Sequence, residues 1–262
     1  MAVRFLEDLA ADEDFKGLAI VGITDGLYFR DGIGLMAGAL DRYGYESPAQ
    51  RSSYVLHRAA SKVFAFMDDA YRLSALVQRL DPGWRPGTRG PCNDVWKVSV
   101  KETGRQTWLW PRIETDARLR ERARAVWMPG ASRRPPPTAE VIARTRAATK
   151  VAVARIRARG GDVIFVRPPS SPELRTSEDA WMPRALGWDP LIATARVEGI
   201  HFDDFSSMQG LDIPEFSHLS RACARVFTDA YVRVIAERLP RVALRADAPP
   251  ALTPADCRPL PR

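Results

Sequence analysis

The sequence predicts an α/β protein in which helices cover a parallel sheet. Residues 18–24 form a continuous apolar run, and residues 162–167 form a second short apolar segment, which is typical of strands buried on both faces. A third short strand is expected around residues 199–203. Helical stretches separate these segments, and this alternation implies right-handed crossovers and therefore a parallel sheet.

The first part of the chain predicts two helices around the first strand. Residues 3–11 are expected to form a short helix that packs through Val3, Leu6 and Leu9. From residue 48 to about 80, apolar residues recur three or four positions apart, which predicts a long amphipathic helix. Its apolar face would consist of Val55, Ala59, Val63, Phe66, Ala70, Leu73 and Val77.

Residues 82–137 predict an irregular insertion, because tryptophan, glycine, proline and charged residues crowd this part of the chain. Within it, a short helix is expected near residues 115–127. The tryptophans favour a small satellite core, with a sugar-stacking wall as the alternative. They are Trp84, Trp96, Trp108, Trp110 and Trp127.

The second half gives clearer helix signals. Residues 138–159 predict an amphipathic helix with Thr138 as its N-cap and a glycine pair at its end. Further helices are expected over residues 184–196 and from residue 219 to about 239. The tail over residues 246–262 is rich in proline and alanine and is expected to be disordered. Residues 1–245 would then form a single domain.

Composition indicates a globular protein with no nucleic-acid partner. The formal net charge of the 262 residues is +7, but the arginines are spread over predicted helix faces and no Lys/Arg run occurs. The three cysteines lack metal-ligand spacing, so neither a metal nor a cofactor is expected, and their odd number makes a poor disulfide framework. No apolar run reaches the length of a membrane span, and early charges argue against a signal peptide.

Polar residues follow each predicted strand, and ligands of parallel α/β sheets bind at this edge. These residues are Thr24 and Asp25; Arg167, Ser170 and Ser171; and Asp203, Asp204, Ser206 and Ser207. Arg167 is a candidate for binding an anionic or acyl-oxygen group, with an ion pair to Glu173 or Glu178 as the alternative. His201, within the third strand, is expected to be a buried structural residue.

The loop before the last helix carries a candidate base, His218. A carboxylate three residues earlier, Glu215, has the separation needed to accept a hydrogen bond from the imidazole, and Asp212 is the alternative acceptor. Such a carboxylate fixes the tautomer, which leaves the other ring nitrogen to activate a hydroxyl. The competing interpretation is a loop histidine without a catalytic role.

Residues 212–228 resemble the last sequence block of SGNH (GDSL-type) hydrolases. That block has the form Asp-x-x-His-Leu and is followed by a helix of small residues. The resemblance is greatest to bacterial SGNH-like proteins related to lipoteichoic-acid D-alanine transfer and polysaccharide O-acetylation. Residues 161–170 resemble the penultimate strand and loop of that set, and residues 15–24 resemble its middle strand. The similarity extends over about residues 3–238.

The resemblance implies a three-layer αβα fold with a flavodoxin-like, SGNH-type parallel sheet. His218 would be the base of a serine nucleophile, and Glu215 would stand in place of the usual aspartate. Thr24 would take the oxyanion-binding position of the family's Gly-x-Asn-Asp block, with Asp25 beside it. Residues 90–94 match the letters of that block better, but no predicted strand precedes them.

The chain also departs from the family pattern, because the serine block and the glycine block that follows it are absent. The resemblance therefore implies that N-terminal strands of the family's sheet are missing. The nucleophile is therefore unknown. Three hypotheses follow: a truncated esterase or O-acyltransferase, a non-catalytic binding or accessory protein of an envelope-modifying system, or an enzyme in which Ser206 or Ser207 is the nucleophile. The family also implies a carbohydrate or acyl-ester substrate, a membrane acyltransferase partner and a periplasmic or membrane-associated location.

Overall fold

A computed structural model of the chain describes residues 2–30, 47–61, 63–67, 73, 98–101, 106–131 and 135–257. Three parallel strands form its main sheet: β1 (Leu18–Gly22), β4 (Asp162–Arg167) and β5 (Glu198–His201). Their spatial order is β1-β4-β5, and both pairings are parallel. The predicted α/β class and the three strand positions are confirmed.

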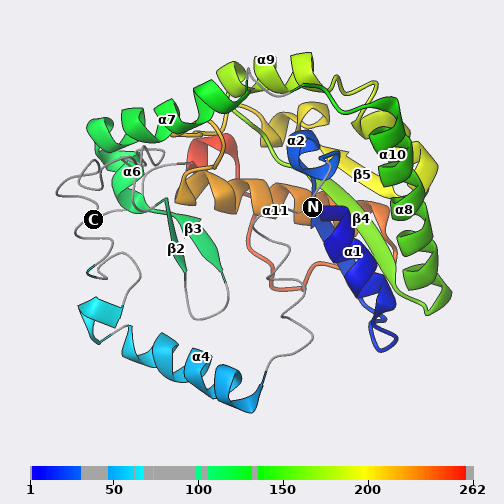
Figure 1. Cartoon of the computed structure of the whole chain (residues 1–262), viewed down its shortest axis with the longest axis horizontal. Coiled ribbons are helices and arrows are strands. Elements are labelled where there is room, and N and C mark those ends of the chain that lie inside the picture. The colour runs from blue at the N-terminus through cyan, green and yellow to red at the C-terminus, as the bar shows by residue number, and fades with distance from the viewer. Residues whose placement is uncertain are drawn as a thin grey trace, which may run out of the picture.

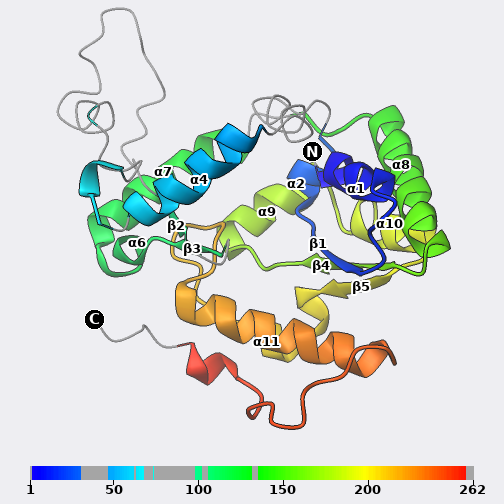
Figure 2. The same ribbon diagram turned by 90° about the horizontal axis from the view of Figure 1, so that it is seen from below.

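Helices cover both faces of this sheet, as Figure 2 shows from its edge. One face packs against α1 (Ala2–Ala11), α8 (Ala139–Ala158) and α10 (Trp188–Ala195). The other face packs against α11 (Arg221–Arg238). Side chains alternate between these cores along β4, since Val163 and Phe165 join the first core and Ile164 and Val166 the second. The described layers are therefore α, β and α.

Local signals fix the ends of the helices around β4. The Thr138 hydroxyl accepts a hydrogen bond from the backbone N–H of Val141 at 3.3 Å, which confirms the predicted N-cap of α8. Gly160, at φ +86°, ends that helix in the left-handed conformation that favours glycine. After β4, Ser171 caps α9 (Pro172–Trp181), a helix that the sequence interpretation did not include.

The prediction that the first strand is buried on both faces was wrong. β1 is an edge strand, and its Ile20 is 45% exposed. Ala19 belongs to the core beneath α1 and α8, whereas α11 packs mainly over β4 and β5. Within the described part of the chain, β4 is the only strand that pairs with β1.

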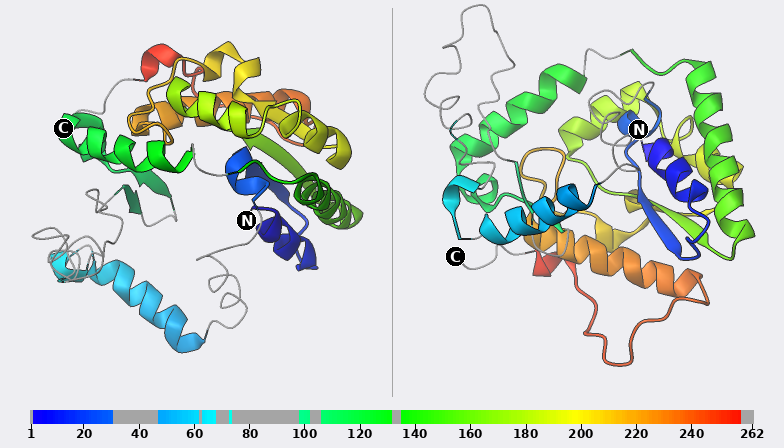
Figure 3. Two further views of the ribbon diagram at one scale, coloured as in Figure 1. Left: turned by 45° about the horizontal axis from the view of Figure 1, so that its top comes forward. Right: turned by 60° about the horizontal axis from the view of Figure 1, so that its bottom comes forward.

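The long helix predicted over residues 48–80 is also different in the structure. Helix α4 (Pro48–Ala60) begins at a Ser47–Gln50 capping box and is followed by the short 3₁₀ helix η2 (Ala65–Met67). Val55 and Phe66, predicted to be buried, are 61% and 66% exposed. Figure 1 and the left view of Figure 3 show α4 apart from the sheet and its covering helices. Residues 74–80 lie outside the described ranges.

Part of the predicted irregular insertion is regular. Strands β2 (Ser99–Lys101) and β3 (Thr107–Leu109) form an antiparallel pair, followed by α6 (Pro111–Thr115) and α7 (Ala117–Ala131). These elements share a small core that includes Trp110 and Ile113. The satellite core is therefore confirmed for Trp110, while Trp84, Trp96 and residues 90–94 lie outside the described residues.

The predicted disorder of the tail was wrong for residues 246–257. This segment packs along α11, and Cys257 forms a disulfide with Cys223 of that helix. The backbone N–H of Leu252 also donates to Asp229 of α11 at 2.9 Å, ahead of the 3₁₀ helix η6 (Pro254–Asp256). Composition gave no sign of these contacts, because a cross-link depends on where the last helix lies. No helix in the described part of the chain is long and apolar enough to cross a membrane.

Candidate functional site

The predicted histidine–carboxylate pair is formed in the loop before α11. His218 Nδ1 lies 2.8 Å from Glu215 Oε1, and this oxygen also accepts the backbone N–H groups of Ser217 and His218. The Glu215 side chain is fully buried, whereas the His218 side chain is 53% exposed. A buried acceptor thus holds an imidazole that solvent can reach. Asp212, the alternative acceptor, is exposed, and its carbonyl accepts the N–H of Ser220.

The backbone of this loop is strained at Phe216. Its φ of +78° places a bulky residue in the left-handed region, which costs free energy unless the surroundings hold it. The Phe216 carbonyl accepts the N–H of Ser171 at 3.0 Å, which ties the loop to the segment after β4. Strain of this kind next to a histidine–carboxylate pair is consistent with a functional site.

Arg124 of α7 holds the same loop through two further contacts. Its Nε donates to the carbonyl of Pro214 at 2.8 Å, and its guanidinium lies 5.0 Å from the centre of the Phe216 ring. Sequence reasoning missed this residue, because 90 positions separate Arg124 from Pro214 and no local pattern links them.

Glu114 of α6 binds the first turn of α11. Its Oε1 accepts the backbone N–H of Arg221 at 2.7 Å, at the positive end of the helix. Burial raises the pKa of Glu114, and the nearby charge of Asp212 adds to this shift. The Arg221 guanidinium lies 4.9 Å from the centre of the Trp108 ring. Figure 2 shows the start of α11 beside β2 and β3, so this small unit borders the histidine loop.

A second polar cluster lies at the carboxyl ends of β1 and β4. Arg167 is 1% exposed and reaches Glu178 of α9 at 2.6 Å and Asp25 at 3.5 Å. Asp25 begins the short helix α2 (Asp25–Tyr28), with Thr24 at its N-cap position. Burial raises the pKa of Asp25, although the charge of Arg167 opposes that shift. Arg167 therefore has the ion pair with Glu178 that was the alternative to substrate binding.

The two clusters share the segment that follows β4. Ser170 Oγ donates to Glu178 at 2.6 Å, and the backbone N–H of the next residue, Ser171, donates to the carbonyl of Phe216. Residues 168–171 thus connect the cluster of Asp25, Arg167 and Glu178 to the loop that carries Glu215 and His218.

The end of β5 carries a buried histidine, His201, and two aspartates that form ion pairs, Asp203 and Asp204. His201 is buried between Trp188 and Phe202, and burial lowers its pKa to about 3, which keeps the ring neutral and confirms its structural role. Asp203 pairs with Arg175 at 2.8 Å. Asp204 pairs with Arg184 at 2.7 Å, and this pairing lowers the pKa of Asp204.

The hydroxyls of several nearby serines have structural bonds. Ser170 donates to Glu178, and Ser171 and Ser220 cap α9 and α11. Ser206 and Ser207 lie in the 3₁₀ helix η5 (Ser206–Met208) after β5. Among the described residues, no cluster of histidine, cysteine or carboxylate side chains has the make-up of a metal site.

Searches of family models, curated proteins and solved structures found no match to this chain. The geometry of the loop before α11 is therefore the main guide to function.

Proposed function

We propose that this chain carries the histidine–carboxylate part of an SGNH-like serine esterase or O-acyltransferase active site, which acts on carbohydrate or cell-envelope esters. The observation that carries the proposal is the 2.8 Å contact between His218 Nδ1 and the buried Glu215. The resemblance of residues 212–228 to the last SGNH block and the position of the loop between a parallel strand and the final helix add support.

In this proposal Glu215 accepts the Nδ1 hydrogen of His218, so Nε2 is the basic nitrogen of the ring. Nε2 removes the proton of the attacking hydroxyl and later returns it to the leaving group. The imidazolium that forms in between is stabilised by the carboxylate, because Glu215 lies in a region of low dielectric. Strained Phe216 and its partners keep the loop in one conformation.

The nucleophile in this proposal is a serine that is not among the hydroxyls with known structural bonds. Ser206 and Ser207, which follow β5, are two candidates within the described residues. The other candidate is a serine on a strand from outside these 262 residues. Thr24 would assist at the oxyanion position, a membrane acyltransferase would be the partner, and the location would be periplasmic or membrane-associated.

The second candidate is a non-catalytic binding or accessory protein of an envelope-modifying system. It is favoured by the enclosure of Arg167, which is 1% exposed, and by the structural bonds of Ser170 and Ser171. These groups follow β4 at the ligand-binding edge, yet each is engaged by another part of the protein.

An ester-hydrolysis assay distinguishes the two candidates. The purified chain is compared with His218→Ala and Glu215→Gln on p-nitrophenyl acetate. If His218 is the base, kcat/KM should fall by about 10²- to 10⁴-fold in His218→Ala, and by less in Glu215→Gln. His57→Ala, which removes another partly exposed histidine, on α4, is the matched control and should retain full activity.

A fluorophosphonate probe locates the nucleophile. Labelling that disappears in Ser206→Ala or Ser207→Ala identifies that residue, and labelling that survives both changes points to another serine. Turnover that is the same in the unmodified chain and in His218→Ala contradicts the role of His218 as the base. No turnover in either variant, together with no labelling by the probe, favours the binding protein as the function.

A further inference from the structure

The outer edge of β1 combines an apolar surface with backbone groups that pair with no other described strand. The backbone N–H of Ile23 donates to the carbonyl of Val166, and the carbonyl of Gly17 accepts the N–H of Asp162. The backbone N–H and C=O groups of the odd-numbered residues in this segment therefore point toward β4. Along a strand, the backbone groups of successive residues point alternately to its two edges. The backbone groups of Leu18, Ile20 and Gly22 therefore point away from β4, to the outer edge. In the described part of the chain no strand pairs with them.

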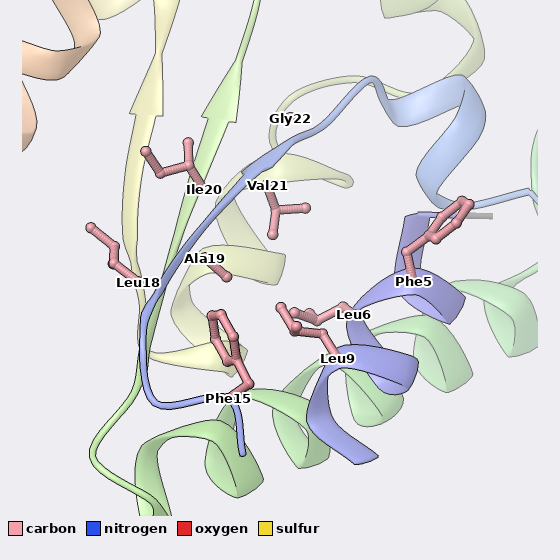
Figure 4. A pocket seen from close by; sticks show the side chains of 9 residues that line it. All are labelled: Phe5, Leu6, Leu9, Phe15, Leu18, Ala19, Ile20, Val21 and Gly22. Carbon is pink, nitrogen blue, oxygen red and sulfur yellow. The ribbon is translucent and has the colours of Figure 1, made fainter. Parts of the chain in front are cut away.

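A pocket of apolar side chains borders this edge, as Figure 4 shows. Phe5 and Leu9 of α1 line it together with Phe15 and the residues of β1. Phe5 and Ile20 are each 45% exposed. An apolar surface beside an unpaired strand is the combination that binds an additional strand in other proteins.

The opposite edge of the sheet is protected in the usual way. Arg238 of α11 donates to the carbonyl of Gly199 in β5 at 3.3 Å and pairs with Glu198 at 3.4 Å. Charged side chains of this kind stop sheets from adding strands. Residues 17–24, by contrast, contain no charged residue and no proline. Among the residues that the structure describes, the sheet is therefore closed at β5 and open at β1.

We infer that the outer edge of β1 is an interface between two copies of this chain. In this interface two β1 strands pair antiparallel about a two-fold axis at Ile20, which makes the same surface serve both partners. Leu18 of one copy then lies opposite Gly22 of the other. The three residues with outward backbone groups all fall at hydrogen-bonded positions, because they are two residues apart.

The side chains of β1 fit this register. Leu18 is large and faces the space above Gly22, where an added Cβ would have no neighbour within 4 Å. On the opposite face of the strand Ala19 lies opposite Val21, which again pairs a smaller with a larger side chain. No like charges meet, since residues 17–24 are uncharged. The result is one continuous sheet with three strands from each copy.

The net charge of +7 predicts how the association of two copies depends on salt. Two copies of like charge repel at long range, and salt screens this repulsion. An apolar interface should therefore associate more strongly as salt is raised, whereas an interface built on ion pairs should weaken.

Molar mass in solution tests the inference, which is independent of the proposed function. Sedimentation of the full chain should give twice 29.2 kDa. Ile20→Lys should halve that mass, because an ammonium group would be desolvated at the centre of the interface. Val151→Lys changes another exposed branched residue, on α8, and should leave the mass unchanged. Circular dichroism verifies that both variants remain folded.

Amide hydrogen exchange supplies a measurement on the unmodified chain. The Ile20 and Gly22 amides should exchange roughly tenfold or more slowly in the dimer than in a diluted, monomeric sample. A monomer whose amides exchange rapidly overturns the inference. So does a monomer with slow exchange, since another strand then covers the edge, and so does a dimer that persists in Ile20→Lys.

Discussion

Two histidines of this protein, His201 and His218, show how differently one side chain is used. His201 is 1% exposed, stacks on Phe202 and meets the edge of Trp188. His218 is half-exposed, and its Nδ1 contacts a carboxylate that is itself buried. In the first case the protein buries the ring, and in the second it buries the ring's partner. Burial of the ring makes a neutral packing residue, whereas burial of the partner makes a candidate base.

The largest expected difference between the two histidines is in stability. His201→Ala should reduce the free energy of unfolding by about 3 kcal/mol, because it leaves a cavity beside Trp188. His218→Ala should cost at most about 1 kcal/mol, since Glu215 keeps its backbone N–H partners. Urea unfolding of both variants measures this. Equal losses in the two variants would contradict the assigned roles.

A smaller effect is expected when the pH is lowered. His201 has a pKa of about 3 in the folded protein, against about 6.5 when unfolded. Between these values the unfolded chain binds a proton that the folded chain excludes, so stability falls as the pH falls through this window. Burial is the main cause, Arg184, Arg175 and Arg167 add to it, and Asp204 opposes it.

For His201 alone, the free energy of unfolding should fall by about 2 kcal/mol between pH 7 and pH 5. Urea unfolding at both pH values measures it, with His201→Gln as the matched neutral variant. Between pH 7 and pH 5, the free energy of unfolding of His201→Gln should fall by about 2 kcal/mol less than that of the unmodified chain. An NMR titration in which His201 gains its proton near pH 6.5 would contradict the shift.

The smallest expected effect concerns the support of His218 by Arg124. Arg124→Met removes the bond to the carbonyl of Pro214 and should lower His218-dependent ester hydrolysis by about 5- to 10-fold, because the loop is less firmly held. The free energy of unfolding should change by less than about 1 kcal/mol. Arg118→Met, an exposed position on the same helix, is the control for loss of charge. Equal activity in the two variants would show that Arg124 does not position the loop.

The core of the fold could be predicted because its signals are local. The N-cap of α8, its glycine stop and the apolar run of β4 lie within a few residues of the elements they define. Helix α9 was overlooked although Ser171 and Pro172 form a recognisable start. The long helix after residue 48 was predicted from periodicity alone, and periodicity does not say what an apolar face packs against.

The parts that could not be predicted depend on contacts between distant residues. The tail was expected to be disordered on composition, yet the disulfide joins residues 34 positions apart. The exposure of Ile20 likewise depends on which strands flank β1, and an apolar run looks the same in the centre and at the edge of a sheet.

The sequence by itself indicated the Glu215–His218 contact, with Asp212 as the alternative acceptor, because three residues of a turn suffice to bring a carboxylate to the ring. It also determined the three strands and their order along the chain. Only the tertiary structure decided that Glu215 is buried, that Arg124 reaches this loop from 90 residues away and Glu114 the first turn of α11 from 107, and that β1 lies at the edge of the described sheet. Short-range contacts follow from spacing, whereas burial and long-range contacts exist only once the chain has folded.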